Sequence, residues 1–291
     1  MSWGGATSAR LPGRRLHLQH GPIDLVIGAF GAEGEVEAAY GQAEARFADV
    51  LATLVAELPT LKRPVGEVYP LLQGPVARRM AAAVWPHRDV FITPMAAVAG
   101  AVADEVLAAL VAGRRLAKAY VNNGGDIAVH LAPGESLSAG LIADVDRPAI
   151  DAVADLRAER PARGIATSGW RGRSFSLGIA DAATAIARDA AAADAAATMI
   201  ANAVDVAHPA VMRKPASHLR DDTDLGERLV TVEVGTLPPE AVEAALDAGA
   251  RRADDLARRG LIEAAALALQ GRFRTVGALA LEGRRTARSW T

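Results

Sequence analysis

The sequence predicts a two-layer α+β protein in which helices pack on paired strands. Strand-like runs occur in neighbouring pairs, such as residues 15–19 and 23–28, and long helical patterns separate one pair from the next. The spacing lacks the strict strand–helix–strand repeat of a parallel sheet. At 291 residues, the chain has room for one large domain or for two fused halves.

The N-terminal half opens with two short strands and continues with a helix. The runs at residues 15–19 and 23–28 are joined by His20-Gly21-Pro22, which is typical of a hairpin. Residues 35–58 then carry one long helical pattern, and Pro59 interrupts the chain after it.

Two further helices and a strand pair complete this half. Helical patterns cover residues 76–84 and 96–111, and Thr93-Pro94 is a typical start signal for the second. Strand patterns at residues 117–121 and 126–131 flank an Asn-Asn-Gly-Gly turn.

The C-terminal half also combines extended segments with helices, in a looser form of the same pattern. Extended segments are expected at residues 137–143, 163–167 and 174–177. An Ala-rich helix is expected over residues 181–204, with Asp181 as its N-cap.

A strand, a helix and a strand end the chain. Residues 229–234 (LVTVEV) alternate as a half-buried strand does, residues 239–259 form an amphipathic helical pattern, and residues 265–276 read as a final strand. No sequence repeat demonstrates a duplication, and no low-complexity linker divides the chain.

The composition excludes several classes of function. The chain has no cysteine, which rules out disulfides, thiolate zinc sites and a cysteine nucleophile. A net charge of −2 and 4% aromatic residues argue against a nucleic-acid partner. The N-terminus lacks an apolar signal segment, and charged residues interrupt the apolar runs. We therefore expect a cytoplasmic protein without a membrane partner.

The turn at Asn122, Gly124, Gly125 and Asp126 is the first candidate site. Two glycines between strands let the backbone approach a ligand closely and expose amides to a phosphate. The same letters fit a simple tight hairpin, so the residues alone leave both interpretations open.

Asp194 and Thr198 are the second candidate site. Four residues apart on a helix, they share one face and place two oxygen ligands one turn apart, which suits Mg²⁺. The alternative is a solvated Asp and a Thr bonded back to the preceding turn.

The segment Thr167-Ser168-Gly169 is the third candidate site. Hydroxyl groups beside a glycine can bind phosphate, but such a cluster also fits a simple turn.

Four segments in one order carry a resemblance to a known family. VAGAVAD, VNNGGDIAV, ATSG and ADAAATMIANAV lie between residues 93 and 205. Together they resemble the FAD:protein FMN transferase (ApbE) superfamily. The resemblance implies a duplicated, T-fold-like α+β domain with antiparallel sheets and helices packed on them. Its two halves would cover about residues 1–132 and 133–291 of a single ApbE-like domain.

The resemblance also implies an activity. Members bind FAD with Mg²⁺ and transfer FMN from FAD to a Ser or Thr of an acceptor protein, with release of AMP. It assigns Asp194 and Thr198 to the metal, and Asp194 and Asp181 to catalysis. It assigns the nucleotide ligand to Gly100, Asn122, Gly124, Gly125, Asp126, Thr167, Ser168, Gly169 and Thr184.

The chain departs from the family pattern in three places, one of which is the N-terminal half, where the family's aromatic, glycine-rich flavin segment is missing. Ala99 stands where the family has a lysine, and the family's later His- and Arg-containing loop retains only Asp181 and Thr184. The closer resemblance is to a short, poorly characterised ApbE-like subfamily. The alternatives are therefore a different enzyme on this scaffold, in sulfur or one-carbon metabolism, and a non-catalytic partner or assembly module. A homo-oligomer also stays open.

Overall fold

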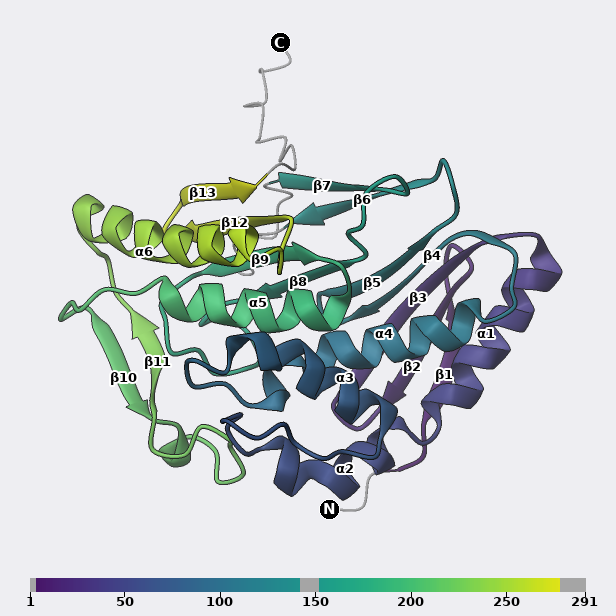
Figure 1. Cartoon of the computed structure of the whole chain (residues 1–291), viewed down its shortest axis with the longest axis horizontal. Coiled ribbons are helices and arrows are strands. Elements are labelled where there is room, and N and C mark those ends of the chain that lie inside the picture. Colours follow the sequence, from purple (N-terminus) through teal and green to yellow (C-terminus); the bar gives the residue numbers. More distant parts are fainter. Residues whose placement is uncertain (1–3, 142–151, 278–291) are drawn as a thin grey trace, which may run out of the picture.

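The computed structural model describes residues 4–141 and 152–277 and is built on one antiparallel sheet (Figure 1). Nine strands form this sheet in the order β1-β2-β3-β4-β5-β8-β9-β12-β13. Their bounds are β1 Thr7–Leu11, β2 Arg15–His20, β3 Ile23–Gly31, β4 Leu116–Asn123, β5 Asp126–Leu131, β8 Gly164–Ser168, β9 Ala182–Ala187, β12 Ala264–Leu269 and β13 Arg272–Gly277. The mixed helix and antiparallel-sheet architecture confirms the predicted α+β class.

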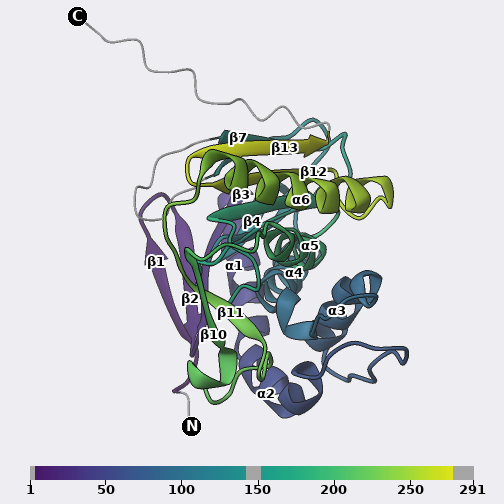
Figure 2. The ribbon, with the colours of Figure 1, turned by 90° about the vertical axis from the view of Figure 1, so that its left-hand side faces the viewer.

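The helices gather on one face of this sheet, as the two views at right angles show (Figures 1 and 2). They are α1 Glu33–Phe47, α2 Val50–Leu61, α3 Pro75–Val84, α4 Val98–Val111, α5 Ala190–Ala203 and α6 Pro239–Arg258, with short 3-10 turns η1 Trp85–His87, η2 Pro94–Ala97 and η3 Ala216–His218.

Two separate strand pairs complete the fold. The hairpin β6 (Ser136–Leu141) and β7 (Ala152–Arg157) covers the other face of the sheet through a small core that includes Val129, Ile165 and Ile186. The pair β10 (Val211–Pro215) and β11 (Leu229–Val234) forms an arm beside the helical layer (Figure 1).

Helix α5 belongs to both main cores. Ala191 and Ala195 pack in the cluster of the N-terminal half, and Ala196 and Ile200 pack in that of the C-terminal half. A run of alanines allows this because neighbouring backbones can approach from several sides. The sheet joins the halves more weakly, since β5 and β8 pair over only two residue pairs. The division of the chain into two halves stays a prediction.

Two predicted elements were wrong in their extent. The helix expected over residues 35–58 is two helices, because the chain breaks at Ala48 and Asp49 and Pro59 lies inside α2. The helix expected over residues 181–204 is strand β9 followed by α5, and Asp189, not Asp181, is the N-cap. All six residues of β9 are buried between β8 and β12, so they show no alternation.

Other predictions need smaller corrections. The final strand expected over residues 265–276 is a hairpin, because Gln270 and Gly271 both have positive φ. Residues 174–177 form no strand but part of an irregular loop. Part of the strand expected at residues 137–143 lies outside the described residues. The remaining helices and strands predicted from the sequence are confirmed to within a few residues.

One described segment, Pro94–Val111, is apolar and long enough to cross a membrane by those two criteria alone. Half of that segment is buried inside the protein, between the sheet and neighbouring helices. Core helices commonly meet the same criteria.

Candidate functional site

Helices α4 and α5 cap each other. Asp104 of α4 is 8% exposed and accepts hydrogen bonds from the amides of Ala190 and Ala191, at 3.0 and 2.8 Å, in the first turn of α5. Asp194 of α5 accepts the amide of Gly100, at 3.0 Å, in the first turn of α4. Each carboxylate therefore lies at the positive end of the other helix.

A second buried carboxylate lies close to Asp194. Asp126, the first residue of β5, is 8% exposed and accepts the Thr167 amide at 3.3 Å. Thr167 in turn shares a 2.8 Å hydroxyl–hydroxyl hydrogen bond with Thr184 of β9. The structure thus brings Asp126, Thr167, Thr184, Asp194 and Gly100, which the sequence separates by up to 94 residues, to one place beside α4.

Both carboxylates have a raised pKa, and the charge of Asp126 contributes to that of Asp194. Burial raises the pKa of Asp126 to about 7, although the Thr167 amide and the charge of Arg173 act in the other direction. Burial first, and the charge of Asp126 second, hold the pKa of Asp194 well above its usual range. Two carboxylates in a buried site favour binding of a proton or a cation.

The donor set fits a hard cation. Thr198 lies one helical turn after Asp194 on α5 and shares its face, so its hydroxyl is a further oxygen donor beside Asp194. Among the described residues, no cluster of three His, Asp or Glu side chains forms a metal cage. Mg²⁺ needs no such cage, because it keeps several waters and takes one or two carboxylates plus phosphate oxygens.

The turn between β4 and β5 has two asparagines with different roles. The side chain of Asn122 accepts the Gly125 amide at 2.8 Å and so shapes the turn itself. Asn123 is buried and donates to the Ala99 carbonyl at 3.0 Å, which ties the turn to the start of α4. The sequence prediction missed Asn123. Strand alternation was the available signal, since Asn123 lies two residues after the buried Val121.

Asp181 and Gly169 lie at the base of a loop rather than beside Asp194. Asp181 accepts the Trp170 indole N–H at 3.2 Å and the Gln270 amide at 2.6 Å, and pairs with Arg171 at 3.3 Å. A Cβ on Gly169 would come within 2.4 Å of the Asp181 carbonyl oxygen. Both residues therefore close the ends of the loop that leaves β8.

The remaining predicted residue, Ser168, ends β8 opposite Ala183 of β9. Its side chain is partly exposed. The catalytic assignment of Asp181 and the ligand assignments of Ser168 and Gly169 stay predictions. Asp104 and Arg173, like Asn123, are residues that the sequence prediction did not select.

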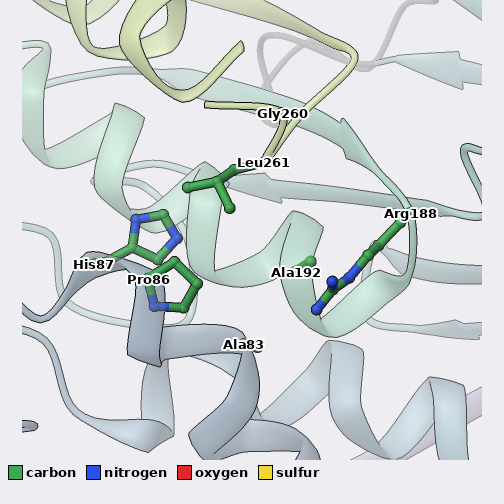
Figure 3. A pocket seen from close by; sticks show the side chains of 7 residues that line it. All are labelled: Ala83, Pro86, His87, Arg188, Ala192, Gly260 and Leu261. Carbon is green, nitrogen blue, oxygen red and sulfur yellow. The ribbon is translucent and has the colours of Figure 1, made fainter. Parts of the chain in front are cut away.

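A small cavity of about 30 Å³ lies away from these residues, between α3, α5 and the end of α6 (Figure 3). His87 on its wall is 2% exposed, and its Nδ1 has no hydrogen-bond partner among the described residues. Burial, Arg252 and Arg259 lower the pKa of His87 to about 4, so its ring is neutral at neutral pH. The lining residues are Ala83, Pro86, His87, Arg188, Ala192, Gly260 and Leu261.

Comparisons with known proteins identify relatives of this chain. A family model described as AbpE bacteria matches residues 8–275. A UPF0280 protein of Methanospirillum hungatei is 34% identical over 161 residues, which are 51% of this chain and 59% of that protein. A UPF0280 protein of Methanothrix thermoacetophila is 41% identical over 133 residues, 45% of this chain and 52% of that protein. The match therefore spans less than two thirds of the length of these two relatives.

A third relative and two solved structures complete the comparison. A UPF0280 protein of Methanopyrus kandleri is 34% identical over 174 residues, covering 57% of this chain and 68% of that protein. The apo flavinyl transferase ApbE of Pseudomonas stutzeri aligns with a TM-score of 0.40 and 14% identity over 94% of both chains. A flavin transferase ApbE variant from Vibrio cholerae aligns with a TM-score of 0.39 and 8% identity, over 95% of this chain and 97% of that one.

Proposed function

Because the chain belongs to the AbpE bacteria family of the ApbE-like superfamily, we propose that it binds a phosphorylated ligand such as FAD together with Mg²⁺. The observation that carries this proposal is the pair of neighbouring carboxylates, buried Asp126 and half-buried Asp194, whose raised pKa values favour a positive partner. The family's lysine is Ala99 in this chain, so a metal ion is the natural source of that charge.

Asp194, Asp126 and the hydroxyl of Thr198 would hold the ion, with water and phosphate oxygens as its other ligands. When bound, Mg²⁺ would neutralise charge on the pyrophosphate of the nucleotide. The Gly100 amide fixes one oxygen of Asp194 and orients the carboxylate toward the site. The Thr167 amide orients Asp126 in the same way.

We further propose the family's reaction for this chain. The phosphoanhydride of FAD would break, the FMN phosphorus would form an ester with the oxygen of a Ser or Thr of an acceptor protein, and the hydroxyl proton would be released. AMP, which contains the other phosphate of FAD, would leave. The acceptor protein and the cytoplasmic location expected from the sequence belong to this proposal. Gly125 is exposed with positive φ, and no atom lies within 4 Å of where its Cβ would stand, so a ligand has room to approach the backbone there.

Calorimetric titration with FAD, with and without Mg²⁺, tests the binding step. The natural protein should bind FAD only with Mg²⁺, and Asp194→Asn should lose that binding. Asp189→Asn is the matched control, because Asp189 also accepts an amide hydrogen bond at the start of α5 and asparagine keeps that acceptor. Binding that is independent of Mg²⁺, or equal in Asp194→Asn, contradicts the proposal. Release of AMP on addition of a Ser- or Thr-containing acceptor then tests the transfer.

A further inference from the structure

The guanidinium group of Arg173 rests on the glycine turn of the candidate site. A Cβ built on Gly124 would lie only 2.0 Å from Nη2 and 3.1 Å from Cζ of Arg173. Any side chain at this position would therefore displace the guanidinium. Gly124 also has a φ of +65°, so both its conformation and its contact with Arg173 favour glycine.

The loop that carries Arg173 is held at its base and exposed at its tip. The Trp170 amide donates to the Ala180 carbonyl at 3.0 Å, and the Leu177 amide donates to the Asn202 side chain at 2.9 Å. Between these anchors, residues 171–174 are exposed. Arg173 is therefore positioned by a fixed frame, while its head group stays accessible to a ligand.

Arg173 lies near the carboxylate site, but its donors are not used by an ion pair or hydrogen bond there. Its guanidinium lies against Gly124, two residues before Asp126 at the start of β5, which places its charge near that carboxylate. Within the described parts of the chain, no ion pair or hydrogen bond of the Arg173 side chain is formed. Its N–H donors remain available for a group outside the protein.

We propose that Arg173 binds the phosphate of the ligand held at the Asp126–Asp194 site and determines its preference for a pyrophosphate group. This inference rests on the proposed function. A planar guanidinium binds phosphate oxygens through two parallel N–H bonds, which a lysine cannot do. The ligand phosphates would lie between the cation on one side and Arg173 on the other, so both charges act on the same group.

The test uses inorganic pyrophosphate as the probe, with Mg²⁺ present, in calorimetric titrations of the whole chain. Arg173→Gln should weaken binding about 10- to 100-fold, as expected for loss of charge-assisted hydrogen bonds. Arg173→Lys should lie between Arg173→Gln and the natural protein. Arg115→Gln removes the same charge at the far end of β4, from a side chain that is 93% exposed, and should bind as the natural protein does.

Gly124→Ala is a second variant, because it keeps Arg173 but displaces the guanidinium from its position against residue 124. It should also weaken pyrophosphate binding. Thermal melting should show that Arg173→Gln is as stable as the natural protein. Equal affinity of Arg173→Gln and the natural protein overturns the role of Arg173 and leaves the proposed function standing. Failure of the natural protein to bind pyrophosphate with Mg²⁺ overturns both.

Discussion

Asp104 and Asp194 lie on neighbouring helices, and each accepts amide hydrogen bonds from the first turn of the other's helix. Their surroundings differ. Asp104 accepts the Ala190 and Ala191 amides, whereas Asp194 interacts with the Gly100 and Ala99 amides and is also affected by the charge of Asp126. The capping role of Asp194 and its proposed metal role can therefore be separated by substitution.

Replacing Asp194 with Ala and with Asn separates these roles. Asp194→Ala leaves the Gly100 amide without its partner and should lower the free energy of unfolding by about 1–3 kcal/mol. Asp194→Asn keeps an acceptor oxygen and removes the repulsion from Asp126, so it should be at least as stable as the natural protein without metal. Urea unfolding in a chelator measures both. Equal destabilisation by Asn and Ala would argue against this division.

The carboxylate pair predicts a loss of stability as the pH rises from acid to neutral. A carboxyl whose pKa is raised in the folded state, as for Asp126 at about 7, stabilises the fold below its unfolded pKa and loses that contribution as pH rises through about 7. In a chelator and in a His87→Gln background, which removes the opposing contribution of His87, the melting temperature should fall between about pH 4 and about pH 7. Asp126→Asn should flatten the fall, and Mg²⁺ should reverse it. A rise in stability over this range would refute the assignment.

His87 predicts a separate loss of stability in acid. Its folded pKa of about 4 lies below its ordinary value of 6.5, so its contribution is present above pH 6.5 and is lost as pH falls through 4. His87→Gln should reduce the acid-induced drop in melting temperature, while His218→Gln, at an exposed position, should retain it. Identical acid profiles for the two variants would show that His87 does not carry the effect.

Two glycines in helices should respond oppositely to alanine. A Cβ on Gly100 would come within 2.2 Å of the Ala190 carbonyl oxygen, so Gly100→Ala must push α4 and α5 apart, at a cost of about 1–3 kcal/mol. Gly41 in α1 has open space around it, and Gly41→Ala should stabilise the protein by roughly 0.5–1 kcal/mol. Chemical unfolding of the two variants checks both signs.

Gly100 has a structural role that its sequence motif does not indicate. The resemblance assigned it to the nucleotide ligand, whereas the structure shows close contact with α5 and an amide donated to Asp194. The two functions are compatible, since the amide orients a proposed metal ligand. Only the tertiary contact reveals how Gly100 takes part.

The sequence predicted most elements but misread those that depend on distant partners. Residues 182–187 (AATAIA) have weak strand propensity and no alternation, and they form a strand because β8 and β12 pair with both edges. Asp104 was missed for the same reason. Its partners, Ala190 and Ala191, lie 86 and 87 residues away, so the VAGAVAD segment that ends in Asp104 does not reveal its capping role.

The candidate site was predicted in part. Spacing on a helix indicated that Asp194 and Thr198 share a face, and the glycine turn was recognised from its letters. The proximity of Asp126 to Asp194 depends on the order of β4, β5 and β8 against α4, which no short motif encodes. The contact between Arg173 and Gly124 likewise requires the loop after β8 to fold back over the turn.

A crystal structure of the protein with FAD and Mn²⁺ in place of Mg²⁺ would test the carboxylate site most directly. Anomalous scattering locates Mn²⁺ independently of the protein's own atoms. We predict one peak bounded by the carboxylates of Asp126 and Asp194, next to the pyrophosphate of the bound FAD. Bound FAD without a peak there, or Mn²⁺ held instead by the exposed Asp221 and Asp222, would contradict the proposed function.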